Sequence, residues 1–231
     1  MDDLRGPAPE LKAAVAALAE LYPQPPVLTD PLALIVWENI GYLIDDERRA
    51  ALFQEFSQRV GLTARAIADA DIGVLTDLAE RSGMRPQARA PRLRDVAQLT
   101  LDLADGDLGK TLAALPLGKA RTLLKRYPTI GDPGADKILL FSGLALRPSL
   151  DSNGVRVLAR LGLIAEQRNY GATYAAAVEV LARDGVMERD WLVEAYGVLR
   201  AHGKTLCKRA APQCLTCPLD EVCGHRVVVT L

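Results

Sequence analysis

The stretch YPTIGDPGADKILL, residues 127–140, decides the fold, because two apolar helical patterns meet here at a short break rich in proline and glycine. Helical spacing of apolar residues covers 118–126 before the break and 133–145 after it. Asp132 is a favourable N-cap for the second helix, and Pro133 a favourable first helical residue. The stretch therefore predicts a helix, a tight turn and a second helix.

The same helical spacing continues along the rest of the chain, and aromatic residues make up only 5% of it. Further helices are expected at 9–22, 32–44, 46–59, 64–69, 72–82, 91–104, 108–114, 153–163, 171–183 and 187–202. The segment 32–44 is apolar on nearly every side, so we expect it to be central and buried. Only VVVTL at the C-terminus has the composition of a strand, and it is too isolated to form a sheet. The sequence therefore predicts an all-α fold.

The net charge of −1 argues against a surface that is basic throughout, but it allows a local basic stripe. No apolar run reaches the length of a membrane span, and the N-terminus lacks a basic segment followed by an apolar one. We therefore expect a cytoplasmic protein, associated with the nucleoid if it binds DNA, and no membrane contact.

All four cysteines fall within seventeen residues, with the spacing C-x6-C-x2-C-x5-C. They are Cys207, Cys214, Cys217 and Cys223. Four clustered thiols indicate one soft metal centre better than a disulfide framework. Zinc modules usually have two short pairs, whereas a single short interval with two longer ones fits a loop around a [4Fe–4S] cubane. Zinc and unrelated buried thiols remain the alternatives.

This cysteine spacing resembles the iron–sulfur loop of endonuclease III and of the adenine-specific mismatch DNA glycosylases. The basic residues Lys208 and Arg209 follow the first cysteine and are expected to contact DNA phosphates rather than only to cover a solvated face.

The predicted hairpin resembles the P-G-V-G-[RK]-x-[TV]-A hairpin of the helix-hairpin-helix DNA glycosylase superfamily, with Thr129 in place of its first glycine. Without that glycine a tight turn is less certain, and an ordinary helix–helix turn is the alternative. In this motif, backbone N–H groups at the hairpin and at the second helix bind phosphate. The expected DNA contacts here are Lys125, Arg126, Thr129, Ile130 and Gly131.

The segment LDSNGVRVLARLG, residues 150–162, resembles the L-D-G-N-V-x-R-V-L-x-R segment of the adenine mismatch glycosylases. Asp151 takes the position of their catalytic aspartate, although by itself it is also a good N-cap. In the superfamily a lysine precedes this aspartate by eighteen residues, and here that position is Pro133. Proline cannot form a Schiff base, so the resemblance implies a monofunctional enzyme that uses water. Lys137, one turn later, is the alternative nucleophile.

A second carboxylate, Glu38, lies in the apolar segment 32–44, where an unpaired acid is costly. One interpretation is that Glu38 has no catalytic role and is bonded to a backbone group or to an arginine. The spacing of Glu38 from the start of its helix resembles that of the adenine and thymine mismatch glycosylases, in which a catalytic glutamate follows the proline that opens the helix by seven residues. Here the proline is Pro31, and Glu38 takes the position of that glutamate. Tyr42 follows one turn later, where relatives place residues that wedge into the duplex.

The resemblance implies a DNA glycosylase of base excision repair that hydrolyses the N-glycosidic bond of a damaged or mismatched base. It implies two helical modules, a six-helix barrel-like module at 30–145 with the hairpin and a cluster module made of 1–29 and 146–231, with the active site in the cleft between them. We expect a monomer whose partner is double-stranded DNA. The alternatives are a catalytically silent DNA-binding protein and a glycosylase with AP lyase activity from a relocated lysine. Which base is excised stays open.

Overall fold

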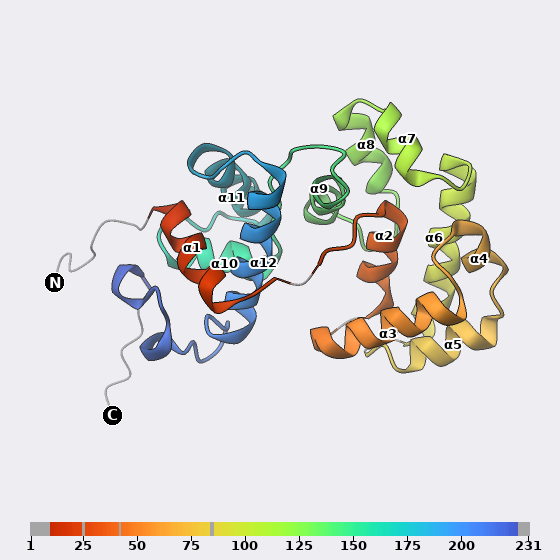
Figure 1. Ribbon diagram of the computed structural model, residues 1–231, viewed down its shortest axis with the longest axis horizontal. Coiled ribbons are helices and arrows are strands. Elements are labelled where there is room, and N and C mark those ends of the chain that lie inside the picture. Colours follow the sequence, from red (N-terminus) through yellow and green to blue (C-terminus); the bar gives the residue numbers. More distant parts are fainter. Residues whose placement is uncertain (1–9, 25, 42, 84–85, 226–231) are drawn as a thin grey trace. The chain divides into compact units, whose positions relative to one another are not determined.

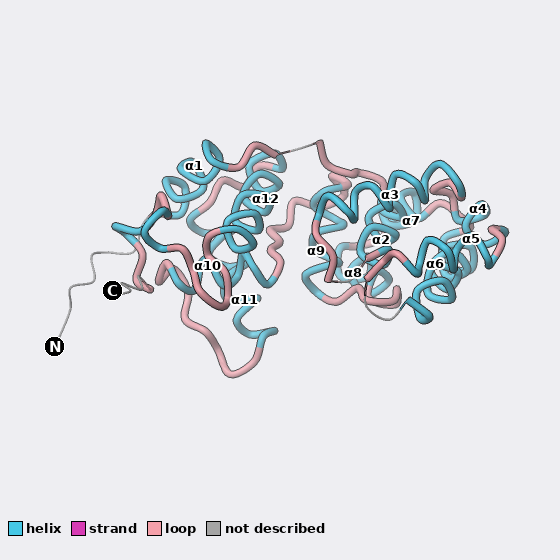
Figure 2. Tube along the Cα trace, turned by 90° about the horizontal axis from the view of Figure 1, so that it is seen from below, coloured by secondary structure: helices cyan, strands magenta, loops and turns pink. Residues whose placement is uncertain are grey.

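The computed structural model describes residues 10–24, 26–41, 43–83 and 86–225. The chain divides into two compact units, one of Val27–Ala145 and one of Met1–Pro26 with Leu146–Leu231. The described part is built of twelve α-helices, three short 3-10 helices and their loops, without a strand (Figure 2). The all-α fold is therefore confirmed, and VVVTL lies outside the described residues.

The unit Val27–Ala145 contains α2 to α9. These helices are α2 (Pro31–Ile40), α3 (Asp46–Arg59), α4 (Ala64–Asp69), α5 (Ile72–Glu80), α6 (Arg89–Ala104), α7 (Leu108–Ala114), α8 (Leu117–Leu124) and α9 (Asp132–Phe141), with a 3-10 turn at Pro86–Ala88. Side-chain caps begin several of them; for example, the carboxylate of Asp30 accepts a bond from the N–H of Ala33 at 2.7 Å. The apolar α2 packs against α3, α6, α7 and α9, so its expected central position is confirmed.

The end of α2 differs from the expectation, because the helix stops at Ile40 and not at Ile44. Gly41 takes an extended conformation, with φ −149° and ψ 145°. A Cβ on Gly41 would lie 2.5 Å from Cδ1 of Ile44, so a larger residue at this position would require the Ile44 side chain to shift. Leu43 then has φ 57°, and 70% of its surface is exposed.

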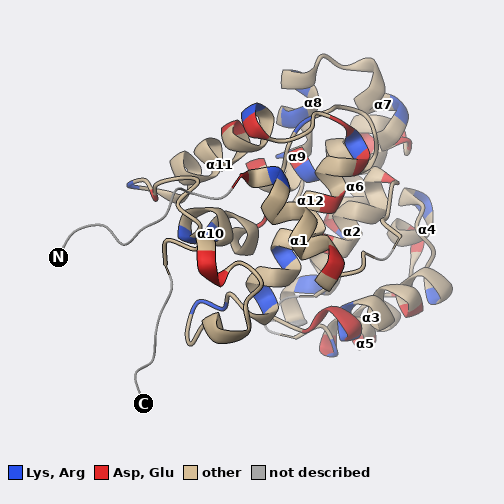
Figure 3. Cartoon of the chain, turned by 60° about the vertical axis from the view of Figure 1, so that its left-hand side comes forward, with Lys and Arg blue, Asp and Glu red and all other residues tan. Residues whose placement is uncertain are grey.

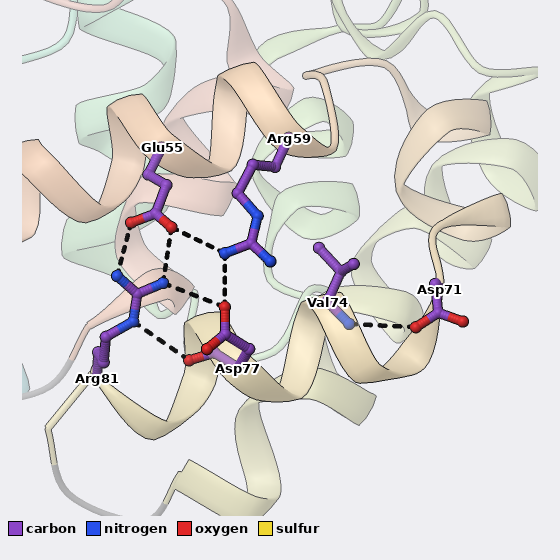
Figure 4. A network of polar contacts seen from close by, with 6 residues as sticks. All are labelled: Glu55, Arg59, Asp71, Val74, Asp77 and Arg81. Atoms are coloured by element: carbon purple, nitrogen blue, oxygen red, sulfur yellow. Dashed lines mark hydrogen bonds and ion pairs between the residues drawn. The ribbon is translucent and has the colours of Figure 1, made fainter.

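Four charged side chains join α3 to α5 on the surface of this unit (Figure 4). Arg81 donates two hydrogen bonds to the carboxylate of Glu55, at 2.7 and 2.8 Å, and Arg59 and Asp77 complete the network. Bonds from Arg81 and then from Arg59 lower the pKa of Glu55 to about 2. Because the network is exposed to solvent, we expect its contribution to the stability of the fold to be small and to depend on pH.

The second unit contains α1 (Leu11–Leu21), α10 (Ser152–Arg160), α11 (Tyr170–Asp184) and α12 (Arg189–Thr205), with 3-10 turns at Cys214–Thr216 and Asp220–Val222. The helix α1 packs on α11 and α12, although nearly the whole chain separates them in sequence (Figure 1). Leu18, Leu158 and Leu199 are fully buried in the core that these helices share. Basic and acidic residues are interspersed along the helices (Figure 3), in keeping with the small net charge.

Candidate functional site

The turn between α8 and α9 forms although it lacks the expected glycine. Thr129 adopts the left-handed conformation, with φ 66°, which glycine would reach without strain. Its hydroxyl donates to Oδ1 of Asn39 at 3.2 Å, and Nδ2 of Asn39 donates to the carbonyl of Pro128 at 3.1 Å. A buried amide from α2 therefore clamps the hairpin in the conformation that Thr129 alone disfavours.

Asn39 is the residue of this region that sequence reasoning missed. Its surface is fully buried, and Arg89 donates to its backbone carbonyl at 3.0 Å. The sequence contains a signal for this role, because an amide in an apolar helix requires hydrogen-bond partners once it is buried. The neighbouring carboxylate of Glu38 has the same requirement. The amide supports the hairpin from within the unit.

The start of α9 is shifted by one residue from the expectation, with Gly131 and not Asp132 at the N-cap. The carboxylate of Asp132 instead accepts bonds from Lys125 at 2.9 Å and from Arg121 at 3.1 Å. Pro133 is thus the second residue of the helix and not the first, although it still lies in the first turn. The N–H groups of Gly131 and Gly134 have no backbone acceptor among the described residues outside their own helix, so they can serve a phosphate.

The remaining hairpin residues differ in what they offer to DNA. Ile130 is 5% exposed and its N–H donates to the carbonyl of Tyr127 at 3.2 Å, so this residue packs inside the unit. Arg126 and Thr129 are exposed, and Lys125 is exposed but paired with Asp132. The predicted wedge residue Tyr42 lies outside the described residues.

Arg121 connects the two helices of the hairpin motif. Its guanidinium donates to both carboxylate oxygens of the fully buried Asp136, at 2.6 and 3.3 Å. A bidentate hydrogen bond between a guanidinium and a carboxylate is both strong and directional. Arg121 is therefore a structural residue that ties α8 to α9.

Glu38 lies on α2, and Lys137 of α9 reaches it. Nζ of Lys137 is 2.6 Å from Oε1 of Glu38, and the two side chains are 10% and 28% exposed. The ammonium also lies 5.5 Å from the ring centroid of Phe141, within range of a cation–π interaction. Both the predicted acid and the alternative nucleophile are thus held in one ion pair.

Asp151 caps α10 in the other unit. Its Oδ1 accepts bonds from the N–H groups of Asn153 and Gly154, both at 2.9 Å. Its Oδ2 accepts from Nδ2 of Asn153 at 2.9 Å and lies 3.5 Å from Nε of Arg200 on α12. Burial first, and then the charge of Asp151, raises the pKa of Tyr170, which places that hydroxyl within the electrostatic reach of the carboxylate.

Two arginines of α10 hold the cysteine loop. Arg156 donates to the carbonyls of Gly203 at 2.6 Å and Cys207 at 3.1 Å, and Arg160 donates to the carbonyl of Lys208 at 2.7 Å. Arg160 also donates to the sulfur of Cys207 at 3.3 Å. The loop is thus fixed to the helix that Asp151 begins, and burial lowers the pKa of Arg156.

The four cysteines line one cavity together with His202 and Arg160. Burial is the main cause of the raised pKa of Cys217 and Cys223, and the other cysteines raise it further. Burial also lowers the pKa of His202 to about 4, so this side chain is neutral near pH 7. Among the described residues no three ligating side chains converge closely enough for one metal ion. Four thiols around a shared cavity are ligands of the kind that a soft metal centre, including an iron–sulfur cluster, takes.

A second, open cavity lies beside this loop at the start of α10. Among the described residues, four basic ones and no acidic one line it, together with Ser152, Asn153 and Gly203. The basic residues are Arg156, Lys204, Lys208 and Arg209. Positive side chains at a helix N-terminus favour an anion such as phosphate.

No family model matches the chain. It is 26% identical to an endonuclease III of Sulfolobus acidocaldarius over 181 residues, which cover 78% of this chain and 75% of that protein. It is 25% identical to a thymine-DNA glycosylase of Aeropyrum pernix over 198 residues, which cover 84% and 82%. The solved structure of a trapped endonuclease III–DNA covalent intermediate superposes with a TM-score of 0.72 at 16% identity, covering 93% of this chain and 94% of that chain.

The resemblance to the helix-hairpin-helix DNA glycosylase superfamily is confirmed. The structure of a thermostable thymine-DNA glycosylase also has a TM-score of 0.72, at 14% identity, with coverage of 94% and 96%. The helix-hairpin-helix is α8, the turn with Thr129, and α9. No helix in the described part of the chain has both the length and the apolar character that crossing a bilayer requires.

Proposed function

We propose that this protein is a DNA glycosylase of base excision repair that hydrolyses the N-glycosidic bond of a damaged or mismatched base with water as nucleophile. The relatives that support this proposal carry the names endonuclease III, thymine-DNA glycosylase and thymine/uracil-DNA glycosylase. The proposed partner is double-stranded DNA, and a structural neighbour described as a non-covalent endonuclease III–DNA complex supports DNA as the partner.

The observation that carries the choice of water is the absence of an available amine at the hairpin. Pro133 stands eighteen residues before Asp151 and has no amine to attack C1′ of the sugar. The nearby amine of Lys137 is bonded to Glu38 at 2.6 Å. A protonated amine in an ion pair has no lone pair for attack, so Schiff-base chemistry and strand cleavage by β-elimination are not favoured.

The two carboxylates take different parts in this proposal. Breaking an N-glycosidic bond builds positive charge on the sugar, and a carboxylate can stabilise that charge much as in glycoside hydrolysis. Asp151 has this part, because its oxygens are fixed by the cap of α10. Glu38 acts on the water or on the leaving base.

DNA is held by backbone donors at the start of α9 and by basic side chains of both units. At the hairpin, the phosphate contacts come from Arg126, Lys125 and the N–H of Gly131. At the basic cavity, they come from Lys208 and Arg209. The four cysteines hold a [4Fe–4S] cluster, whose contribution here is to shape the loop that carries these two basic residues.

A second candidate is a DNA-binding protein without catalysis. It is favoured by one observation, that both oxygens of Asp151 already have hydrogen-bonding or charged partners. Retention of Glu38 together with Asp151 favours the enzyme, because binding alone needs neither.

The test is a panel of duplexes, each with one lesion or mismatch, incubated with the full chain and scored for abasic sites. The glycosylase should release at least one base and leave abasic sites that break only on later alkali treatment. Asp151→Asn should reduce release by about a hundredfold or more while retaining binding, since a placed charge contributes on that scale. Asp190→Asn, at an exposed carboxylate, is the control. Binding without release by the parent would favour the second candidate.

The same duplexes test the nucleophile. Borohydride should trap little covalent adduct with the parent protein. Strong trapping that disappears in Lys137→Ala would instead make this lysine the nucleophile.

Iron analysis of the purified protein tests the cluster. About four irons per chain and broad absorbance near ~400 nm are expected for a thiolate-bound cubane. Colourless, folded protein with one zinc would overturn the assignment.

A further inference from the structure

The ion pair between Lys137 and Glu38 has a consequence for the chemistry of the site. Lysine is rarely buried unless it is paired, and only 8% of the surface of the whole Lys137 residue is exposed. Its Nζ lies 2.6 Å from Oε1 of Glu38, the distance of a charge-assisted hydrogen bond. The neighbours of Lys137 on α9, Asp136 and Ile138, are both fully buried, so this part of the helix is packed in place.

The ammonium of Lys137 has an aromatic neighbour in addition to Glu38. The Phe141 ring lies one turn further along α9, with its centroid 5.5 Å from Nζ. The ring and the carboxylate both attract the ammonium, and together they restrict where the amine can turn. Lys137 is therefore placed to orient Glu38 and not to act as a nucleophile.

We infer that Lys137 is a positioning residue that keeps Glu38 an anion, so that Glu38 takes a proton from water and does not protonate the leaving base. The inference rests on the proposed function. A carboxylate that accepts a bond from an ammonium has no proton to donate, but it has lone pairs that can receive one.

The reaction then has a defined sequence of bonds and protons. The water oxygen forms a bond to C1′ as the bond from C1′ to the base nitrogen breaks. The water proton goes to Glu38, and the electron pair of the broken bond leaves with the base as an anion. That anion later takes a proton from solvent, and Glu38 returns its proton to solvent.

This sequence restricts the substrate class. A base can leave as an anion when ring carbonyls stabilise the charge on its nitrogen, as in uracil and its 5-substituted forms. Adenine and other purines that require protonation before departure are disfavoured. The site thus selects a pyrimidine with two ring carbonyls.

Two variants of the full chain separate charge from packing at this position. Lys137→Met keeps an unbranched side chain and removes the ammonium. Lys137→Arg keeps the charge. Lys110→Met, at an exposed lysine of α7, is the matched control.

Single-turnover release of uracil, 5-fluorouracil and adenine is measured for each variant. The parent should release 5-fluorouracil faster than uracil, and adenine slowest, because an anion leaves faster when its nitrogen is more acidic. Lys137→Met should lose about 10–100-fold on uracil, below the full contribution of a general base. Lys137→Arg should stay within about tenfold of the parent. Equal rates for uracil and 5-fluorouracil in the parent, or adenine as the preferred base, would overturn the inference.

The charge of Glu38 provides a readout that needs no base release. The carboxyl carbon of Glu38, assigned in glutamate-labelled protein by comparison with Glu38→Gln, should have the chemical shift of a carboxylate at pH 7. It should move in Lys137→Met and not in Lys110→Met. A protonated Glu38 in the parent at pH 7 would refute the inference even if the protein releases no base, whereas a carboxylate in an inactive protein would refute only the proposed function.

Discussion

Replacing Asn39 by alanine should destabilise the unit Val27–Ala145 and loosen its hairpin. The substitution removes the bonds from Nδ2 to the carbonyl of Pro128 and from Thr129 to Oδ1. The partly buried carbonyl of Pro128 left without its donor costs about 1–3 kcal/mol, and the lost bond to the exposed Thr129 about 0.5–1.5 kcal/mol. The better helix propensity of alanine offsets roughly 0.5 kcal/mol. The expected loss in the free energy of unfolding is therefore roughly 1–4 kcal/mol.

Urea unfolding measures this loss. The chain has two tryptophans, and Trp37 lies on α2, so a Trp191→Phe background makes fluorescence report on this unit alone. The unfolding midpoint should fall and the dependence of the free energy on urea should stay unchanged. A loss below about 0.5 kcal/mol would show that Asn39 does not clamp the turn, because even one ordinary hydrogen bond contributes that much.

A double-mutant cycle with Thr129→Gly isolates the clamp. Glycine removes about 1–2 kcal/mol of left-handed strain but also loses the bond to Asn39 and adds freedom to the unfolded chain. In the parent these effects should nearly cancel. In Asn39→Ala the bond is already gone, so glycine should stabilise by roughly 1 kcal/mol more than in the parent. The same effect in both backgrounds would refute the coupling between these residues.

Three further outcomes are expected. Arg126→Glu should weaken binding to all duplexes alike and reduce the salt slope of log K by about 1, as measured by anisotropy against Arg65→Glu; an unchanged slope would exclude a phosphate contact. Cys217→Ser should lower the iron content and the absorbance near ~400 nm, and full retention of iron would remove this ligand from the set. Glu55→Gln should lower stability at pH 7, and its difference from the parent should vanish as pH falls from 4.5 towards 2, because the lowered pKa stabilises the fold only while the carboxylate is charged. A difference that persists at pH 2 would contradict this origin.

The sequence by itself determined where most helices lie. The expected segments 46–59, 64–69 and 108–114 match α3, α4 and α7 at both ends. Spacing of apolar residues and capping side chains act within one or two helical turns, so they can be read from neighbouring residues. The clustered cysteines and the segment that begins at Asp151 were readable for the same reason, since each is a short run with its own spacing.

Only the tertiary structure decided what the polar side chains do. Glu38 and Lys137 are 99 residues apart in sequence, and Asn39 and Thr129 are 90 apart. Nothing in the periodicity of α2 or α9 says which of their residues meet, because that depends on how the two helices pack. The end of α2 was missed because the backbone becomes extended at Gly41, where the local apolar pattern would have continued the helix. Local sequence thus specifies helices, whereas the partners of buried charges and amides are specified by packing between segments far apart in the chain.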